Sequence, residues 1–139
     1  MFNDLDLYNK KYRNLFIRSI IKTVKKNIFI FDKNVDDLEK KLARFTGSKY
    51  VCTVGSGTDA LLISLLSLNL SKGDEVIIPS FSWLSVIEVV LLLKLKPIFI
   101  DSSIENFNLE INNLKNLINK KTKVVISTSL FGRTCDLKK

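Results

Sequence analysis

The sequence predicts an α/β protein in which a mostly parallel sheet is flanked by helices on both faces, giving three layers. Short, continuous apolar runs suited to buried strands, such as residues 76–78 and 97–100, alternate with longer apolar or amphipathic runs suited to helices. A turn with paired glycines, Gly55-Ser56-Gly57, separates one strand candidate from one helix candidate. Strands that are apolar on both sides need helices above and below them, so these patterns together indicate the three layers.

The first part of the chain is predicted to be helical. Between Asp4 and Lys26, apolar residues recur every three or four positions with Lys and Arg between them, which predicts an amphipathic helix. Residues 28–31 are expected to form a short extended link, and residues 32–34 a turn. We therefore expect an N-terminal helical segment over residues 1–34.

Residues 35–139 are expected to form the α/β domain. A helix over residues 35–45 opens it, with its apolar residues inward and Gly47 just past its end. The next helix, over residues 60–68, is expected to be buried. Strands are expected over residues 49–54, 76–78, 97–100 and 123–127, and further helices over residues 84–93 and after an N-cap at Asn108.

Three loops are expected at the carboxyl ends of these strands, which is where sheets of this class bind ligands. They cover residues 55–59, 80–83 and 127–133. The first loop also leads into a helix, so free backbone N–H groups and the positive end of a helix dipole should meet there. Such an arrangement binds phosphate.

The same glycine turn has a second interpretation. Gly55 to Ala60 is a G-x-G-x-x-A string between a strand and a helix, as in dinucleotide-binding Rossmann-like domains. That fingerprint requires an acid at the end of the next strand, which here ends in Ile78-Pro79-Ser80. The dinucleotide-binding domain therefore stays open as the weaker alternative.

Composition restricts the possible partners. The formal charge is +8, from 22 Lys+Arg against 14 Asp+Glu, but the bases are scattered and predict no nucleic-acid partner. Two distant cysteines and no histidine disfavour a metal site and a disulfide scaffold, and favour a reduced, cytoplasmic compartment. No apolar signal region opens the chain, and the longest apolar run, residues 76–93, is interrupted by Pro79 and Glu88. No membrane association is expected.

Four blocks of the chain resemble the sugar aminotransferases of the DegT/DnrJ/EryC1/StrS family, in order and in spacing. The blocks are Ser56-Gly57-Thr58-Asp59-Ala60-Leu61, then residues 73–83, then Pro97 to Asp101, and then Ser129-Leu130-Phe131-Gly132 with Asp136. The family has the aspartate-aminotransferase type of fold and depends on pyridoxal 5'-phosphate (PLP). The resemblance thus implies that residues 35–139 form the first, incomplete part of a PLP-dependent transferase large domain.

The resemblance also implies roles for particular residues. The amides around Gly57, Thr58 and Asp59, with the Thr58 hydroxyl, would hold the PLP phosphate, and Trp83 would stack on the PLP ring. These four are the expected cofactor-binding residues; no catalytic residue and no metal ligand is expected in this chain. Asn27 and Asp32 replace frequent glycines of the family, and both residue types tolerate the left-handed backbone that a glycine there would adopt.

Family members are nearly three times as long as this chain. Their Schiff-base lysine, and the acid that pairs with the pyridine nitrogen, match no position here, so we expect an N-terminal portion that is inactive alone. By the resemblance, the reaction would move an amino group, with glutamate as the expected donor, to a nucleotide-linked keto-sugar in amino-sugar or surface-polysaccharide biosynthesis. A full-length enzyme would be a homodimer. A non-catalytic truncated relic, or a partner of an intact copy, is the alternative.

Overall fold

The computed structural model describes residues 5–30 and 32–135, with side chains from residue 9 onward. Asp4, Phe31 and Asp136, which entered the expectations above, lie outside the described residues. Contacts group the chain into two compact units, Met1–Thr53 and Val54–Lys139, which are described separately below. The division expected at residue 34 stays a prediction.

The first unit contains α1 (Leu5–Lys26) and α2 (Lys33–Thr46). Asn27, directly after α1, has a φ of 54°, which confirms the left-handed backbone expected there. The same expectation for Asp32 is wrong, because Asp32 has φ −73° and ψ 146°. It is the residue that precedes α2, and an N-cap residue needs an extended backbone. Gly47, with φ 72°, ends α2 as predicted.

The apolar face of α2 is not buried, contrary to the prediction. No residue of α2 falls in the buried class, and Phe45 is 88% exposed. The spacing of apolar residues predicted the helix correctly, but the burial of its face depends on what packs against it, which spacing does not specify.

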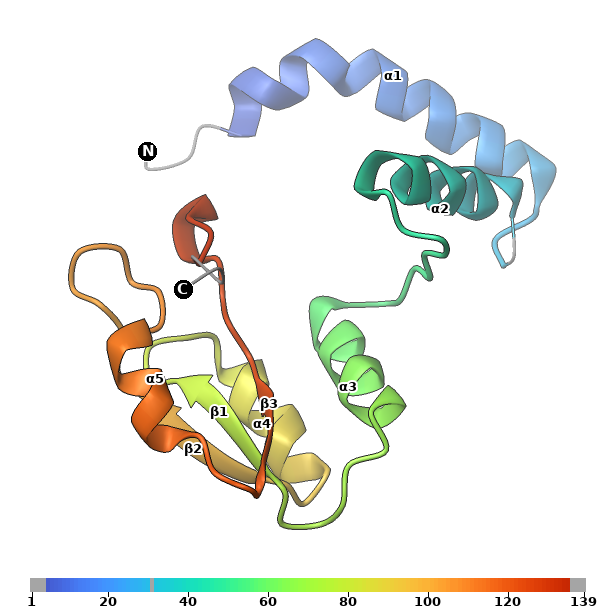
Figure 1. Ribbon diagram of the computed structural model, residues 1–139. Helices are drawn as coiled ribbons and strands as arrows, with labels where there is room; N and C mark the ends of the chain where they lie inside the picture. Colours follow the sequence, from blue (N-terminus) through green and yellow to red (C-terminus); the bar gives the residue numbers. More distant parts are fainter. Residues whose placement is uncertain (1–4, 31, 136–139) are drawn as a thin grey trace. The chain divides into compact units, whose positions relative to one another are not determined.

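The second unit is built around a parallel three-stranded sheet (Figure 1). Its strands are β1 (Glu75–Pro79), β2 (Lys96–Ile100) and β3 (Thr122–Val125), in the spatial order β2-β1-β3. Both outer strands run parallel to β1, and Ile77 lies level with Ile98 and Val125. The other elements are α3 (Gly57–Ser67), α4 (Leu84–Leu92), α5 (Ile111–Leu117) and the 3-10 turn η1 (Leu130–Gly132).

Helices cover both faces of the sheet. Val76 and Ile78 of β1 belong to one core cluster with Leu65 of α3 and with the buried valines of α4. Ile77, which points to the opposite face, belongs to a second cluster, against which Leu114 of α5 packs. All five residues of β1 are buried, so the predicted three-layer α/β fold is confirmed.

Three local predictions are wrong. Residues 49–54 form no strand, because within the described part of the chain no neighbouring strand pairs with them. The helix predicted over residues 60–68 was expected to be buried. It starts at Gly57 instead, as α3, and Leu65 is its sole buried residue. Asn108 is no N-cap, since α5 follows Glu110 and the buried Asn108 amide donates to the Thr134 carbonyl over 3.1 Å.

No helix in the described residues combines the length and the apolar character that crossing a membrane requires. Among the same residues, potential metal ligands (His, Cys, Asp and Glu) nowhere gather in groups of three or more.

Glu75 ties the amino ends of the sheet together. Its carboxylate is 7% exposed and accepts from the Asn119 amide at 2.7 Å and from the Lys96 ammonium at 2.9 Å. These bonds join the first residue of β1 to the first residue of β2 and to the turn before β3. The Asn119 bond and then the Lys96 bond lower the pKa of Glu75 below its ordinary 4.5, against the opposing effect of burial.

The Glu75 network predicts a pH-dependent stability. Because the folded-state pKa is depressed, the stabilisation is complete above about pH 4.5 and is lost as the pH falls through the folded pKa. In urea unfolding, Glu75→Gln should therefore have a lower free energy of unfolding than wild type at neutral pH. This difference in free energy should narrow near about pH 3. The control is Glu88→Gln on the exposed side of α4. A loss of unfolding free energy in Glu75→Gln that is the same at both pH values would contradict a stabilising role for the ionised Glu75 carboxylate.

Candidate functional site

The start of α3 is closed by a reciprocal contact between Ser56 and Asp59. Ser56 has an extended backbone, with φ −155° and ψ 166°, and is the N-cap. Its hydroxyl oxygen accepts the Asp59 N–H at 3.1 Å, while the hydroxyl donates to Asp59 Oδ2 at 2.9 Å. This arrangement is a variant of the capping box, and it fixes the first turn of the helix.

Two backbone amides remain available at this helix start. The first N–H groups of any α-helix lack acceptors within the helix. Here the Asp59 N–H donates to Ser56 Oγ and the Ala60 N–H to the Ser56 carbonyl, at 3.0 Å, which leaves the N–H groups of Gly57 and Thr58. Both residues are exposed. They lie at the positive end of the helix dipole, so they can hold an anion.

The two glycines of the turn have different reasons to be glycine. A Cβ on Gly57 would have no heavy atom within 4 Å, so open space lies beside its backbone and a ligand could approach closely. A Cβ on Gly55 would come within 3.1 Å of Asp59 Oδ2. Gly55 therefore makes room for the Ser56–Asp59 contact, and Gly57 leaves the anion position open.

Trp83 is a surface residue. It is 79% exposed and immediately precedes α4, with its carbonyl accepting the Val86 N–H at 3.1 Å. A core position for Trp83 is thus excluded. An exposed indole in this loop can offer its face to a flat ring.

The expected site residues share the carboxyl edge of the sheet. α3 leads into β1 and α4 leaves it, so both helices run opposite to the strand and begin toward its carboxyl end (Figure 1). The two helices pack on each other, since Leu61 and Leu62 of α3 contact the core cluster that contains Val86 of α4. The structure therefore places Gly57, Thr58 and Asp59 on the first turn of one helix, and Trp83 at the start of its neighbour.

Unpaired polar atoms gather at this same edge. Four buried side-chain oxygens in the described residues lack a hydrogen-bond partner, and all four lie after the carboxyl ends of strands: Ser82 after β1, Ser102 and Asn108 after β2, and Thr128 after β3. Unsatisfied buried polar groups are uncommon in folded proteins, and those that occur often mark functional regions. Their distribution supports the carboxyl edge as the functional side.

An aromatic cluster joins the three loops of this edge. The Phe107 ring lies 5.9 Å from the Phe81 ring and 5.6 Å from the Phe131 ring, measured between centroids. Phe107 and Phe131 both have a left-handed backbone, with φ 61° and 55°. Such a conformation is unfavourable for a bulky residue and persists where surrounding contacts hold it. The cluster therefore brings side chains from the loops after β1, β2 and β3 into contact with one another.

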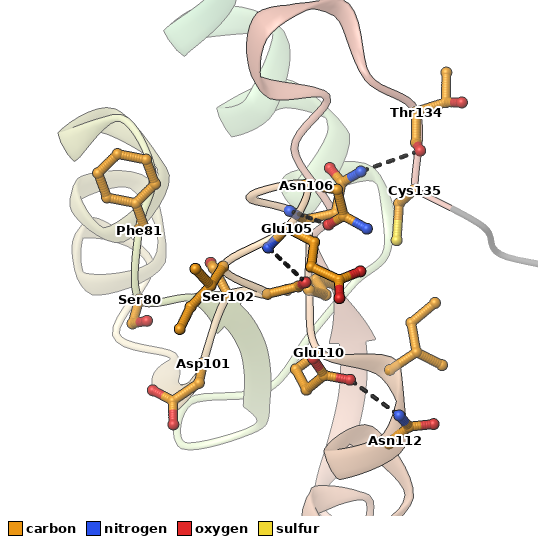
Figure 2. A pocket seen from close by; sticks show the side chains of 15 residues that line it. Ser80, Phe81, Asp101, Ser102, Glu105, Asn106, Glu110, Asn112, Thr134 and Cys135 are labelled. Carbon is orange, nitrogen blue, oxygen red and sulfur yellow. Dashed lines mark hydrogen bonds between the residues drawn. The ribbon is translucent and has the colours of Figure 1, made fainter.

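Beside the cluster lies an open cavity of about 890 Å³ (Figure 2). Ser80 and Phe81 line one side of it, and Thr134 and Cys135 line the other. Its charged lining groups are all carboxylates, namely Asp101, Glu105 and Glu110, with no Lys or Arg. This lining disfavours a phosphate group. The amides at the start of α3 remain the better position for an anion.

The fold and these amides define the class: an α/β protein with a parallel sheet and, toward the carboxyl edge of that sheet, a helix start whose first two amides are exposed. Residues 10–139 match the model of the DegT/DnrJ/EryC1/StrS aminotransferase family, and the chain belongs to that family. The chain is 35% identical over 138 residues to UDP-2-acetamido-2-deoxy-3-oxo-D-glucuronate aminotransferase of Pseudomonas aeruginosa, covering 98% of this chain.

Solved structures agree with this assignment. A DegT DnrJ EryC1 StrS aminotransferase from Brucella abortus superimposes with a TM-score of 0.88 over 99% of this chain and 39% of its own, at 27% identity. The E. coli GDP-4-keto-6-deoxy-D-mannose-3-dehydratase, solved with hydrated PLP, gives 0.76 over 80% of this chain and 30% of its own, at 29% identity. The present chain spans 38% of the length of the Pseudomonas relative.

Several residues of the edge were missed from the sequence. Ser56 was identified only as part of the turn, although S-x-x-D before an apolar run is an N-cap signal that could have indicated its hydroxyl. Phe107 carries no local signal, since its partners come from other loops. In the first unit, Glu39 Oε1 accepts the Thr53 N–H at 2.8 Å, and this pairing, which spans 14 residues, likewise has no motif.

The Ser56 cap can be tested by stability. Ser56→Ala removes the acceptor of the Asp59 N–H and should lower the free energy of unfolding by about 1 kcal/mol, whereas Ser56→Thr keeps the hydroxyl and should largely retain the wild-type stability. Ser64→Ala, within the same helix, is the control and should change the stability by less than about 0.5 kcal/mol. Urea unfolding of the three variants decides the matter. A Ser56→Ala variant as stable as wild type would show that the cap does not hold the turn.

Proposed function

We propose that this chain binds the phosphate of PLP at the start of α3 and forms the N-terminal part of an aminotransferase that acts on nucleotide-linked keto-sugars. The observation that carries the proposal is the pair of exposed amides of Gly57 and Thr58 in a chain of this family. The aminotransferase activity of the Pseudomonas relative on a UDP-linked oxo-sugar supports the substrate class. The PLP held by the similar E. coli structure supports the cofactor.

Each expected residue has a distinct part in cofactor binding. The N–H groups of Gly57 and Thr58 and the Thr58 hydroxyl donate to phosphate oxygens, and the dipole of α3 adds a favourable field. The Asp59 amide already donates to Ser56, so Asp59 contributes mainly by keeping the turn in shape. Trp83 covers one face of the pyridine ring and excludes water from it.

The bound cofactor supplies an electron sink for the substrate's carbanion, which is the chemistry that side chains lack. Within residues 1–139 we assign no lysine for covalent attachment and no acid for the pyridine nitrogen. Glutamate as the amino donor, a homodimeric assembly, a cytoplasmic location and a role in polysaccharide or amino-sugar biosynthesis are parts of the same proposal.

Pyridoxamine 5'-phosphate is the probe that tests it, because it has no aldehyde and cannot react with surface lysines. Trp83 is the single tryptophan of the chain, so its fluorescence reports a ring placed on it. We expect pyridoxamine 5'-phosphate to quench this fluorescence and to bind about tenfold more tightly than pyridoxamine, because charge-assisted bonds to the phosphate contribute that much. Thr58→Val should reduce the preference, and Thr23→Val on α1 should not.

Two results would overturn the proposal. One is equal affinity for pyridoxamine and pyridoxamine 5'-phosphate, which would show that the phosphate does not bind at the start of α3. The other is binding of NAD or NADP without binding of pyridoxamine 5'-phosphate, which would restore the dinucleotide interpretation of the glycine turn.

A further inference from the structure

The amino edge of the sheet, opposite the candidate site, is formed by three turns of the second unit. They join α3 to β1, α4 to β2 and α5 to β3, over residues 68–74, 93–95 and 118–121. Because the strands are parallel, all three turns return the chain to the same end of the sheet (Figure 1). Backbone hydrogen bonds join them: the Gly73 N–H donates to the Lys94 carbonyl at 3.1 Å, and the Glu75 N–H to the Lys121 carbonyl at 2.8 Å.

These turns bring together lysines that lie far apart in the sequence. In the sequence the bases are scattered, but each turn, taken with the first residues of its strand, supplies at least one lysine to this edge. Against them stand two acids, Asp74 and Glu75, so four positive charges are in excess. All six lysines are exposed, and we call them the lysine patch: Lys72, Lys94, Lys96, Lys120, Lys121 and Lys123.

The acids of this edge leave most of the patch unneutralised. The buried Glu75 carboxylate pairs with Lys96 Nζ at 2.9 Å, and Asp74 Oδ2 accepts the Ser71 N–H at 2.8 Å. Among the described residues, Lys72, Lys94 and Lys120 form no ion pair. Their ammonium groups are therefore available to anionic groups from outside the protein.

Exposed aliphatic side chains accompany the lysines. Leu68 follows α3, Leu92 ends α4 and Ile118 follows α5, and each is more than half exposed. Each precedes the first lysine of its own turn by two to four positions. The same stretches, residues 68–75, 92–96 and 118–123, contain no aromatic residue and no arginine.

This composition distinguishes between anionic partners. Nucleic-acid surfaces commonly use aromatic side chains for base stacking and arginine for planar, bidentate contacts, and this edge has neither. Lysines beside exposed aliphatic side chains suit an anionic lipid surface, because the ammonium groups reach the headgroups and the aliphatic groups enter the boundary with the acyl chains. Such surfaces attract clusters of about four to eight basic residues, and the patch has six.

We propose that the amino edge of the sheet binds an anionic phospholipid surface through the lysine patch and the three aliphatic residues beside it. The sequence predicted no membrane association because it has neither a signal region nor a spanning segment, and binding at a membrane surface needs neither. In this orientation the carboxyl edge, with the start of α3, faces away from the lipid and stays open to ligands. The inference does not depend on cofactor binding.

Sedimentation with lipid vesicles tests the inference. Wild type should bind vesicles of equal parts phosphatidylcholine and phosphatidylglycerol, should bind pure phosphatidylcholine far more weakly, and should lose affinity as salt is raised. Each lysine near an anionic surface strengthens binding by about fivefold, so the triple variant Lys72→Gln/Lys94→Gln/Lys120→Gln should bind about 100-fold more weakly. The three side chains come from different turns and form no ion pair in the described residues, so the variant should keep the wild-type unfolding midpoint.

A second triple variant separates the patch from the overall charge. Lys10→Gln/Lys22→Gln/Lys25→Gln, on α1, removes the same number of charges from the first unit and should bind anionic vesicles nearly as wild type does. Leu92→Ser tests the aliphatic contribution. It should weaken binding to anionic vesicles and leave any binding to a double-stranded DNA fragment unchanged, because an exposed leucine adds affinity only where it leaves water.

Three results would overturn the inference: equal binding to the two kinds of vesicle, an α1 variant that loses as much affinity as the patch variant, or tighter binding to the DNA fragment than to anionic vesicles in the same buffer. Binding that the patch variant loses and the α1 variant keeps supports it. The patch variant should retain the preference for pyridoxamine 5'-phosphate over pyridoxamine, so failure of this inference is distinguishable from failure of the proposed function.

Discussion

The second unit depends on the burial of one short strand on both of its faces. Val76, Ile77 and Ile78 of β1 are at most 1% exposed, and they point alternately to opposite sides of the sheet. Such a strand is stable only with parallel neighbours at its edges and helices on both faces, and the structure has β2 and β3 beside it and α3, α4 and α5 over it. The three layers follow from this one apolar run.

The buried position of β1 also determines where the candidate functional site lies. Helices that connect parallel strands run opposite to them, so the helices next to β1 begin near its carboxyl edge, where their unsatisfied N–H groups face outward. The unpaired buried oxygens and the three clustered phenylalanine rings are found in the loops of that edge. Two regions of this edge differ in the charge of the groups that line them. The amides of α3 suit an anion, and the carboxylate-lined cavity after β2 does not.

Features that depend on local sequence were predictable, and features that depend on distant partners were not. β1, β2 and β3 were identified because each is a continuous apolar run. Gly57, Thr58, Asp59 and Trp83 were assigned to the cofactor because they fall in loops whose order resembles a family, and that role stays a prediction. Residues 49–54 have the composition of a strand, but a strand also needs a neighbour, and composition does not provide one. Two other predictions failed for the same reason: that the apolar face of α2 is buried, and that Asn108 is the N-cap of a helix. Glu39 and Thr53 meet only in the folded chain.

The central claim is that the start of α3 binds the cofactor's phosphate, and amide NMR tests it most directly. In a titration of the isotopically labelled chain with pyridoxamine 5'-phosphate, the amide resonances of Gly57 and Thr58 should shift most, and the same titration with pyridoxamine should leave them nearly unchanged. Shifts that centre instead on residues 102–110, or a saturated complex in which Gly57 and Thr58 do not move, would contradict the account.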